Sequence, residues 1–257
     1  MGGAVARGLA QRAEAAGYSL TVSNPSEGKL SALKADCPFL NVTADNRRAA
    51  HQADLIILAV KPWKIRDVIT EIRTEVNTRR QSVASLAAGI SLAQLHAWFL
   101  PEDGSDESMP RLYRVIPNTA ATVLESMTFI SPAQLEPGPD ACVREVFGAL
   151  GEAVLVEESK LAACTALSSC GLAFVMRYIR AAMSGGVELG LSVCESRDYM
   201  LQTMLGAVRM LRASGCHPEE EIDRVTTPGG LTIRGLNAME AHGFTNSVIQ
   251  GLKASVH

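Results

Sequence analysis

The first part of the chain alternates between short apolar runs and amphipathic segments. Residues 19–24, 54–60, 82–89 and 112–116 are mostly apolar or small, which predicts strands buried on both faces. Between these runs, for example in residues 65–76, apolar side chains recur every three or four positions, as in amphipathic helices. This alternation predicts an α/β fold whose parallel sheet carries helices on both faces, with right-handed crossover connections.

Weaker patterns complete this part of the chain. We expect further strands near residues 41–43, 127–130 and 153–157, and further helices at residues 1–13, 26–34, 46–52, 92–100 and 141–150. Residues 101–111 are acidic and are expected to form a solvated loop.

The strand patterns end near residue 158, and the rest of the chain predicts helices only. The longest helix is apolar on most sides and has one narrow polar stripe, formed by Arg177, Arg180 and Ser184, so it should be enclosed in a core or a subunit interface. Further helices are expected at residues 196–213, capped by Ser196, from Pro218, at 232–242 and at 245–255. We therefore expect two domains, a Rossmann-like domain at residues 1–158 and a helical domain at residues 159–257.

Composition and charge limit the classes of protein to which this chain can belong. With 257 residues, 47% of them hydrophobic, the chain can bury two modest cores. Its net charge of -3 gives no electrostatic reason to expect nucleic acid or an anionic membrane as a partner. Arg177, Arg180 and Glu188 interrupt the longest apolar stretch, so we expect no membrane span, and no secretory signal opens the chain.

The cysteines occur singly, without a C-x-x-C pair or a zinc-type spacing to histidine. They are Cys37, Cys142, Cys164, Cys170, Cys194 and Cys216. Such residues are typical of the reduced, small core side chains of a cytoplasmic protein, and we expect no metal site.

The carboxyl ends of the predicted strands share one edge of the sheet, where an open α/β fold binds its ligand. Small and backbone-exposing residues at this edge suit a dinucleotide. The candidate cofactor-binding residues are Gly2, Ser23, Asn24, Ser26, Asn46, Ala59, Val60, Lys61, Pro62, Ala88, Gly89 and Asn118. Lys61, Pro62 and Asn118 are expected near the nicotinamide.

The residues after the first predicted strand indicate which cofactor is used. An NAD site normally has an Asp or Glu there for the ribose diol, whereas this chain has Ser23-Asn24 followed by Ser26 and Lys29. NADPH is therefore expected, with NADH possible. Gly2 would be the third glycine of G-x-G-x-x-G, so the first strand and the earlier glycines would precede Met1, and a protein beginning at Met1 should bind NADPH poorly.

Two turns are candidate anion sites. The segment from Ser168 to Gly171 would place hydroxyls and backbone N–H groups beside the start of the long helix, although an ordinary helix–helix corner explains it as well. The turn Pro228-Gly229-Gly230 feeds directly into another helix and leaves its first N–H groups bare. The candidate substrate-binding residues are Ser168, Ser169, Cys170, Gly171, Gly229, Gly230, Leu231 and Thr232, with Ser169 and Thr232 as the candidates closest to the chemistry.

Several motifs, in one order along the whole chain, resemble those of pyrroline-5-carboxylate reductases. They are Val60-Lys61-Pro62, Arg114-Val115-Ile116-Pro117-Asn118-Thr119, Thr165-Ala166-Leu167-Ser168, Gly185-Gly186-Val187, Gln202-Thr203, Thr226-Thr227-Pro228-Gly229-Gly230-Leu231-Thr232 and Met239-Glu240-Ala241-His242-Gly243-Phe244. The resemblance implies reduction of 1-pyrroline-5-carboxylate to proline with NAD(P)H by an intertwined homodimer, often assembled into larger rings. It also implies that the substrate carboxylate lies between the turn before the long helix and the Pro-Gly-Gly turn of the partner.

The chain departs from this family pattern at the expected substrate site. Cys170 replaces a serine, Phe174 a tyrosine, Leu231 a threonine and Ala162 an aspartate, and Leu172 stands where the family has proline. These changes leave backbone donors but remove side-chain donors. Cys170, Leu172 and Leu231 keep a related imine or keto-acid reductase open as an alternative. The first strand expected before Met1 keeps a second alternative open, a non-catalytic dimeric relative.

Overall fold

The computed structural model describes residues 1–100 and 109–256, without the side chains of residues 13–16. It divides into two compact units, Met1–Ser169 and Cys170–His257. Most of the acidic loop predicted at residues 101–111 lies outside the described residues.

The first unit contains seven strands in its described part, arranged in two sheets. They are β1 (Thr21–Ser23), β2 (Asn41–Thr43), β3 (Leu55–Leu58), β4 (Ser82–Ser85), β5 (Arg111–Ile116), β6 (Ser126–Pro132) and β7 (Gly151–Leu155). β1 and β2 form a parallel pair, and the larger sheet has the order β3-β4-β5-β6-β7. Among the described residues no strand pairs with both β1 and β3, so the strands form two sheets.

One pair of neighbouring strands departs from the predicted parallel arrangement. β6 pairs antiparallel with β5, whereas the other neighbouring strands are parallel. The segment between β5 and β6 contains only the short 3-10 helix η2 (Thr119–Val123), which is too short for the crossover that a parallel pair needs.

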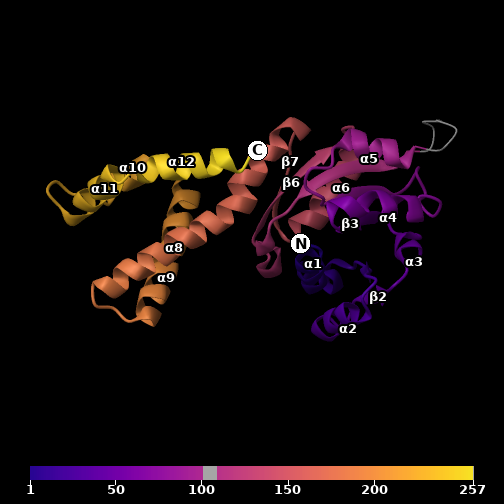
Figure 1. The fold of residues 1–257 in the computed structure, drawn as a ribbon, viewed down its shortest axis with the longest axis horizontal. Coiled ribbons are helices and arrows are strands. Elements are labelled where there is room, and N and C mark those ends of the chain that lie inside the picture. The colour runs from indigo at the N-terminus through magenta and orange to yellow at the C-terminus, as the bar shows by residue number, and fades with distance from the viewer. Residues whose placement is uncertain (101–108, 257) are drawn as a thin grey trace. The chain divides into compact units, whose positions relative to one another are not determined.

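Helices cover both faces of the larger sheet, as predicted (Figure 1). The α-helices of this unit before residue 158 are α1 (Gly2–Ala16), α2 (Glu27–Asp36), α3 (Asn46–Ala50), α4 (Ile65–Ile72), α5 (Leu92–Phe99) and α6 (Pro137–Gly148). Val83 and Leu112 face a core with α4 and α5, whereas their neighbours Ala84 and Tyr113 face a core with α1 and α6. Side chains alternate between the faces of a strand, so each of these central strands contributes to both cores.

Residues 158–188 form one helical stretch with three kinds of turn. The 3-10 turn η3 (Glu158–Lys160) leads into α7 (Leu161–Thr165), the π-helical segment η4 (Ala166–Cys170) and α8 (Gly171–Glu188). By length and composition this helix passes as a candidate membrane span, although we expected Arg177 and Arg180 to prevent this. A single such helix is weak evidence for a membrane span, because apolar helices of globular proteins have the same length and composition.

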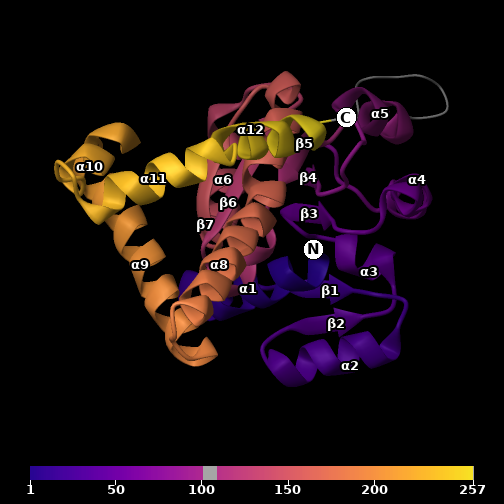
Figure 2. The ribbon, with the colours of Figure 1, turned by 60° about the vertical axis from the view of Figure 1, so that its left-hand side comes forward.

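The second unit is helical throughout its described residues, as predicted (Figure 2). After α8 come α9 (Val193–Ser214), α10 (Pro218–Arg224), α11 (Leu231–Ala241) and α12 (Phe244–Ala254). The predicted cap of α9 is wrong by one turn. Ser192, not Ser196, is the N-cap, and it forms a capping box with Glu195.

Within a single chain, the long helix is not enclosed. No residue of α8 is buried, and Phe174, Val175 and Met176 are exposed. In α9, the side chains of Leu201 and Leu205 are exposed as well. Of the two enclosures that the sequence allowed, a domain core and a subunit interface, this exposed apolar surface favours the second.

Candidate functional site

The start of α1 lies against the end of β3. A Cβ atom on Gly2 would lie 3.0 Å from the Cβ atom of Ala59 and 3.3 Å from its carbonyl oxygen. A residue without a side chain therefore allows this close approach of helix and strand. The structure brings the predicted residues Gly2 and Ala59 together, and the N-terminal end of α1 favours an anion at this edge of the sheet.

Residues at and after the carboxyl ends of β1 and β2 form a polar cluster. The Ser23 hydroxyl donates to Oδ1 of Asn46 at 2.7 Å, and the backbone N–H of Ser26 donates to Oδ1 of Asn24 at 2.9 Å. The backbone N–H of Asn24 donates to the carbonyl oxygen of Thr43 at 3.2 Å, which joins the two strand ends. These contacts place Ser23, Asn24, Ser26 and Asn46 in one cluster.

A carboxylate that the sequence did not predict reaches this cluster. Nδ2 of Asn46 donates to Oε2 of Glu71, on α4, at 2.8 Å. Only tertiary packing of α3 against α4 brings Glu71 here, so no local pattern could have found it. The contact fixes the Asn46 amide, since its oxygen accepts from Ser23 and its nitrogen donates to Glu71.

The segment after β3 carries an exposed aromatic side chain that the sequence analysis also missed. Lys61 is the N-cap of the 3-10 helix η1 (Pro62–Lys64), and its ammonium lies 6.0 Å from the centre of the Trp63 ring. Trp63 is 73% exposed. A large exposed ring at this edge offers a flat apolar surface to a bound ring system.

Asn118 makes hydrogen bonds within the fold, and these limit its availability for the predicted contact with the cofactor. Its side-chain oxygen accepts from the N–H of Ala120 at 3.0 Å and caps η2, while its own N–H donates to Oγ of Ser126 at 3.1 Å. The residue is buried. The expected contact of Asn118 with a nicotinamide stays a prediction, and its amide oxygen is already occupied.

The first predicted anion site has a different local structure from the one expected. Residues 166–170 form a π-helical segment inside a continuous helix, and Cys170 has helical backbone angles. There is neither a turn nor a free helix N-terminus at Ser168, because the helix does not end before α8. The expected dipole contribution to anion binding is therefore wrong here, and the hydroxyl groups are the remaining polar donors.

The two serines of the π-helical segment are oriented differently. Oγ of Ser168 is buried and has no hydrogen-bond partner among the described residues. Oγ of Ser169 donates to the carbonyl oxygen of Pro117 at 3.5 Å, so this serine lies directly after the carboxyl end of β5. Single π-helical turns inside α-helices occur frequently at functional sites. The structure thus brings the substrate candidate Ser169 to the edge that carries the cofactor candidates.

The second predicted anion site has the expected geometry. Gly229 adopts a left-handed conformation with φ of 71°, and Gly230 is the extended N-cap of α11, whose first residue is Leu231. A Cβ atom on Gly230 would overlap the Thr227 hydroxyl. Leu231 is 86% exposed. The first turn of this 11-residue helix therefore presents backbone N–H groups beside Thr232, without a side-chain cap.

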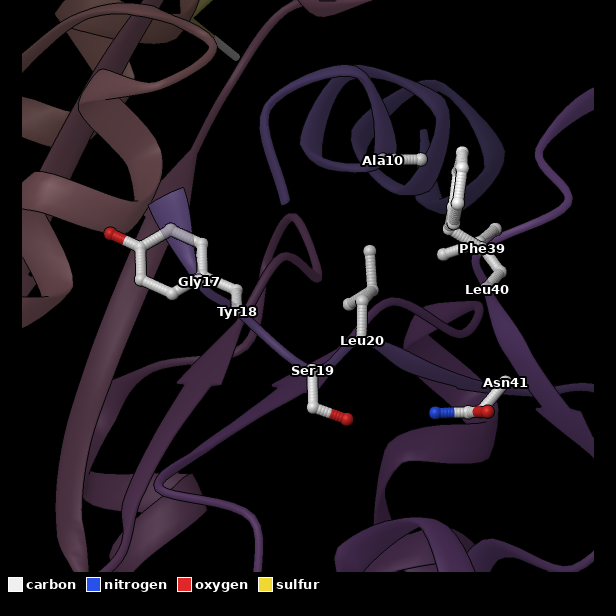
Figure 3. A pocket seen from close by; sticks show the side chains of 8 residues that line it. All are labelled: Ala10, Gly17, Tyr18, Ser19, Leu20, Phe39, Leu40 and Asn41. Atoms are coloured by element: carbon white, nitrogen blue, oxygen red, sulfur yellow. The ribbon is translucent and has the colours of Figure 1, made fainter. Parts of the chain in front are cut away.

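Two further features lie outside this arrangement. Within the described residues, no group of three or more His, Cys, Asp or Glu side chains could hold a metal ion. An open hollow of about 370 Å³ lies beside the amino ends of β1 and β2, at the opposite end from the cofactor candidates (Figure 3). Its lining includes Leu20, Phe39 and Leu40, and the Tyr18 hydroxyl points away from them, toward Glu145.

Comparison with protein families gives two matches. Residues 158–257 match the pyrroline-5-carboxylate reductase dimerisation family, and residues 2–89 match the family described as NADP oxidoreductase, coenzyme F420-dependent. The chain is 31% identical over 268 residues to pyrroline-5-carboxylate reductase 2 of Dictyostelium discoideum, covering 99% of this chain and 87% of that one. It is 37% identical over 221 residues to pyrroline-5-carboxylate reductase of Methanosarcina acetivorans, covering 84% and 79%.

Solved structures give the same picture. The chain is similar to Plasmodium falciparum pyrroline carboxylate reductase with NADP bound, with a TM-score of 0.84 and 26% identity over 100% of this chain and 92% of that one. It is also similar to pyrroline-5-carboxylate reductase from Coxiella burnetii, with a TM-score of 0.87 and 28% identity over 98% and 93%. The predicted fold class, a Rossmann-like domain followed by a helical dimerisation domain, is confirmed.

Proposed function

Because this chain belongs to the pyrroline-5-carboxylate reductase family, we propose that it reduces 1-pyrroline-5-carboxylate to L-proline, the last step of proline biosynthesis. The observation that carries the proposal is the position of Ser169, whose hydroxyl lies 3.5 Å from the Pro117 carbonyl oxygen after β5. A serine at the carboxyl edge of the sheet can orient a substrate next to a bound dinucleotide. The predicted membership of the family is confirmed.

The polar cluster after β1 and the start of α1 fit NADPH. Gly2 lets the N-terminal end of α1 approach the diphosphate, while Ser23, Asn24 and Ser26 are polar neighbours for a ribose 2′-phosphate. Lys29, on α2, adds a cationic side chain to this segment. When bound, the cofactor supplies the hydride that adds to the C=N carbon of the substrate.

The protein's own task is to hold the substrate carboxylate and to orient the ring. Ser168, Ser169, Cys170 and Gly171 supply one side of the site, and Gly229, Gly230, Leu231 and Thr232 of the partner subunit supply the other. The C=N carbon is most electrophilic when the imine nitrogen is protonated, and an imine that binds in this form needs no strong general acid. A hydroxyl such as that of Ser169 or Thr232 is sufficient to hold the proton-bearing nitrogen or the carboxylate.

The assembly follows from the second unit. The chain forms a homodimer through its dimerisation domain. We further propose a ring of such dimers, a cytoplasmic location supported by six unpaired cysteines, and no nucleic-acid or membrane partner. We place the functional domain boundary near residue 158, where η3 begins.

The decisive experiment is to follow NADPH oxidation with pyrroline-5-carboxylate, and then with larger cyclic imine acids and with keto acids. We expect the highest kcat/KM for pyrroline-5-carboxylate, and a higher kcat/KM with NADPH than with NADH. Preference for another imine or for a keto acid would favour the related reductase that Cys170, Leu172 and Leu231 leave open. Failure to bind either cofactor would contradict the proposal and favour a non-catalytic relative.

A further inference from the structure

One carboxylate connects three separate segments of the first unit. Oε1 of Glu158 accepts a hydrogen bond from a guanidinium N–H of Arg114, on β5, at 2.8 Å. The same oxygen accepts from the backbone N–H of Leu92, the first residue of α5, also at 2.8 Å. Glu158 itself begins the helical stretch that carries Ser168 and Ser169. The family resemblance and the proposed mechanism assign no role to it.

Each connected segment leads to a part of the proposed site. The loop before Leu92 contains Ala88 and Gly89, which are cofactor candidates after β4. The strand that carries Arg114 ends at Ile116, immediately before Pro117, the partner of Ser169. Ile116 also packs with Leu161 of α7 in one small core. This apolar contact joins β5 to the helical stretch in addition to the ion pair of Arg114 and Glu158.

The chemistry of the pair makes Glu158 difficult to replace. The Arg114 side chain is only 15% exposed, and its buried Nε atom has no hydrogen-bond partner in the described part of the chain. Loss of the Glu158 carboxylate would leave a largely buried guanidinium charge without its anionic partner. The Glu158 carboxylate would then no longer join Arg114, the loop before α5 and the start of the helical stretch.

We propose that Glu158 is a positioning residue that fixes the Ala88-Gly89 loop and the Ser168-Ser169 segment relative to β5. It acts through Arg114 and the Leu92 N–H and does not touch the reacting atoms. This inference rests on the proposed function, because it assumes that the loop holds the cofactor and the serines hold the substrate. It predicts that one side chain affects both binding steps together.

The test compares Glu158 with a second ion pair on the same strand. Nε of Arg111 lies 2.8 Å from Oε2 of Glu136, at the opposite end of β5 from the site, so Glu136→Ala is a matched control. For wild type, Glu158→Ala, Glu158→Gln and Glu136→Ala, we would measure the NADPH Kd by fluorescence, KM and kcat for pyrroline-5-carboxylate, the melting temperature, and backbone hydrogen exchange.

We expect Glu158→Ala to raise both the NADPH Kd and the imine KM by about tenfold, since small displacements of binding groups strongly weaken oriented binding. Hydrogen exchange should increase together in residues 87–92 and 166–171. Glu158→Gln keeps an acceptor oxygen and should show a smaller change in the same direction. Glu136→Ala should lower the melting temperature without changing Kd, KM or the exchange of these two segments.

Unchanged Kd and KM in both Glu158 variants would overturn the proposal, and so would equal changes in Glu136→Ala. Should Glu158→Ala fail to fold, Glu158→Gln decides. Should the wild-type protein fail to reduce pyrroline-5-carboxylate, the proposed function fails, while NADPH binding and the coupled exchange of the two segments still decide the positioning role.

Discussion

Glycines at close approaches determine where backbones can meet in this protein. In α8, a Cβ atom on Gly186 would lie 2.6 Å from Oγ and 3.0 Å from the Cβ atom of Ser196, on α9. The neighbouring Gly185 has open space at the same point. Gly186 is therefore needed for the close contact between α8 and α9, whereas Gly185 is not, although the two residues are adjacent in the sequence.

Gly186→Ala should destabilise the protein by about 1–3 kcal/mol, because the added methyl group overpacks the contact with Ser196. Gly185→Ala, in the same helix, should be neutral or stabilise by up to about 1 kcal/mol, since alanine favours the helix and meets no atom of its own chain. Urea unfolding at one fixed protein concentration measures both. Equal destabilisation by the two substitutions would contradict the assigned contact.

Thr232 is the residue at which we predict the clearest effect on substrate binding. Thr232→Ala should raise KM for the imine acid more than KM for NADPH, because it removes a charge-assisted hydrogen bond worth about 1.5–3 kcal/mol. Steady-state kinetics with each substrate varied in turn test this. Thr245→Ala is a suitable control, since that hydroxyl donates to Glu240 within the helical unit. An unchanged imine KM and kcat/KM would mean that the Thr232 hydroxyl has no part in binding.

At the scale of elements, the sequence pattern within a strand or helix predicted that element. Contacts between elements could not be predicted from such patterns. The apolar runs of β3, β4 and β5 predicted buried strands, and these strands contribute to cores on both faces of the sheet. The reversal of β6 depends on the length of the connection to β5, and the strand pattern itself does not encode direction. Glu71 and Glu158 join the site only through tertiary contacts, so no local pattern identifies them.

The π-helical segment shows a second limit of the sequence. Small polar residues in Ser168-Ser169-Cys170-Gly171 are typical of a turn, and they predicted an interruption before α8. The structure keeps the helix continuous and changes its hydrogen-bonding pattern. Serines also bond to nearby backbone groups within helices, so composition alone does not distinguish a turn from a π-helical segment.

The start of α9 gives a direct test of an element boundary. Oγ of Ser192 accepts from the N–H of Glu195 at 3.2 Å, and the Glu195 carboxylate accepts from the Ser192 N–H at 2.9 Å. Ser192→Ala should therefore cost about 1 kcal/mol of stability. Ser196→Ala should be close to neutral or slightly stabilising, because its buried hydroxyl has no partner in the described residues. Thermal unfolding distinguishes the two serines, and the reverse ranking would restore Ser196 as the cap.

At the scale of the whole molecule, the helical unit requires a second chain. Exposed apolar residues on α8, α9 and α12, among them Met176, Leu205 and Ile249, leave too much apolar surface for an isolated subunit. The dimerisation family matched by residues 158–257 agrees with this conclusion. If a site combines Ser169 of one subunit with the Pro-Gly-Gly turn of its partner, dimerisation is a condition for activity as well as for stability.

A mixed dimer tests this sharing of the site. Ser169→Val and Gly230→Val should each abolish most activity in a homodimer, the first by removing the hydroxyl and the second by overlapping Thr227. In a two-fold symmetric heterodimer of these variants, one site receives both substitutions and the other receives neither. Co-expression with two different affinity tags isolates that heterodimer, which should recover about half of the wild-type activity. If both groups of a site came from one subunit, each subunit of the heterodimer would carry a damaged site, and the activity would stay at the level of the homodimeric variants.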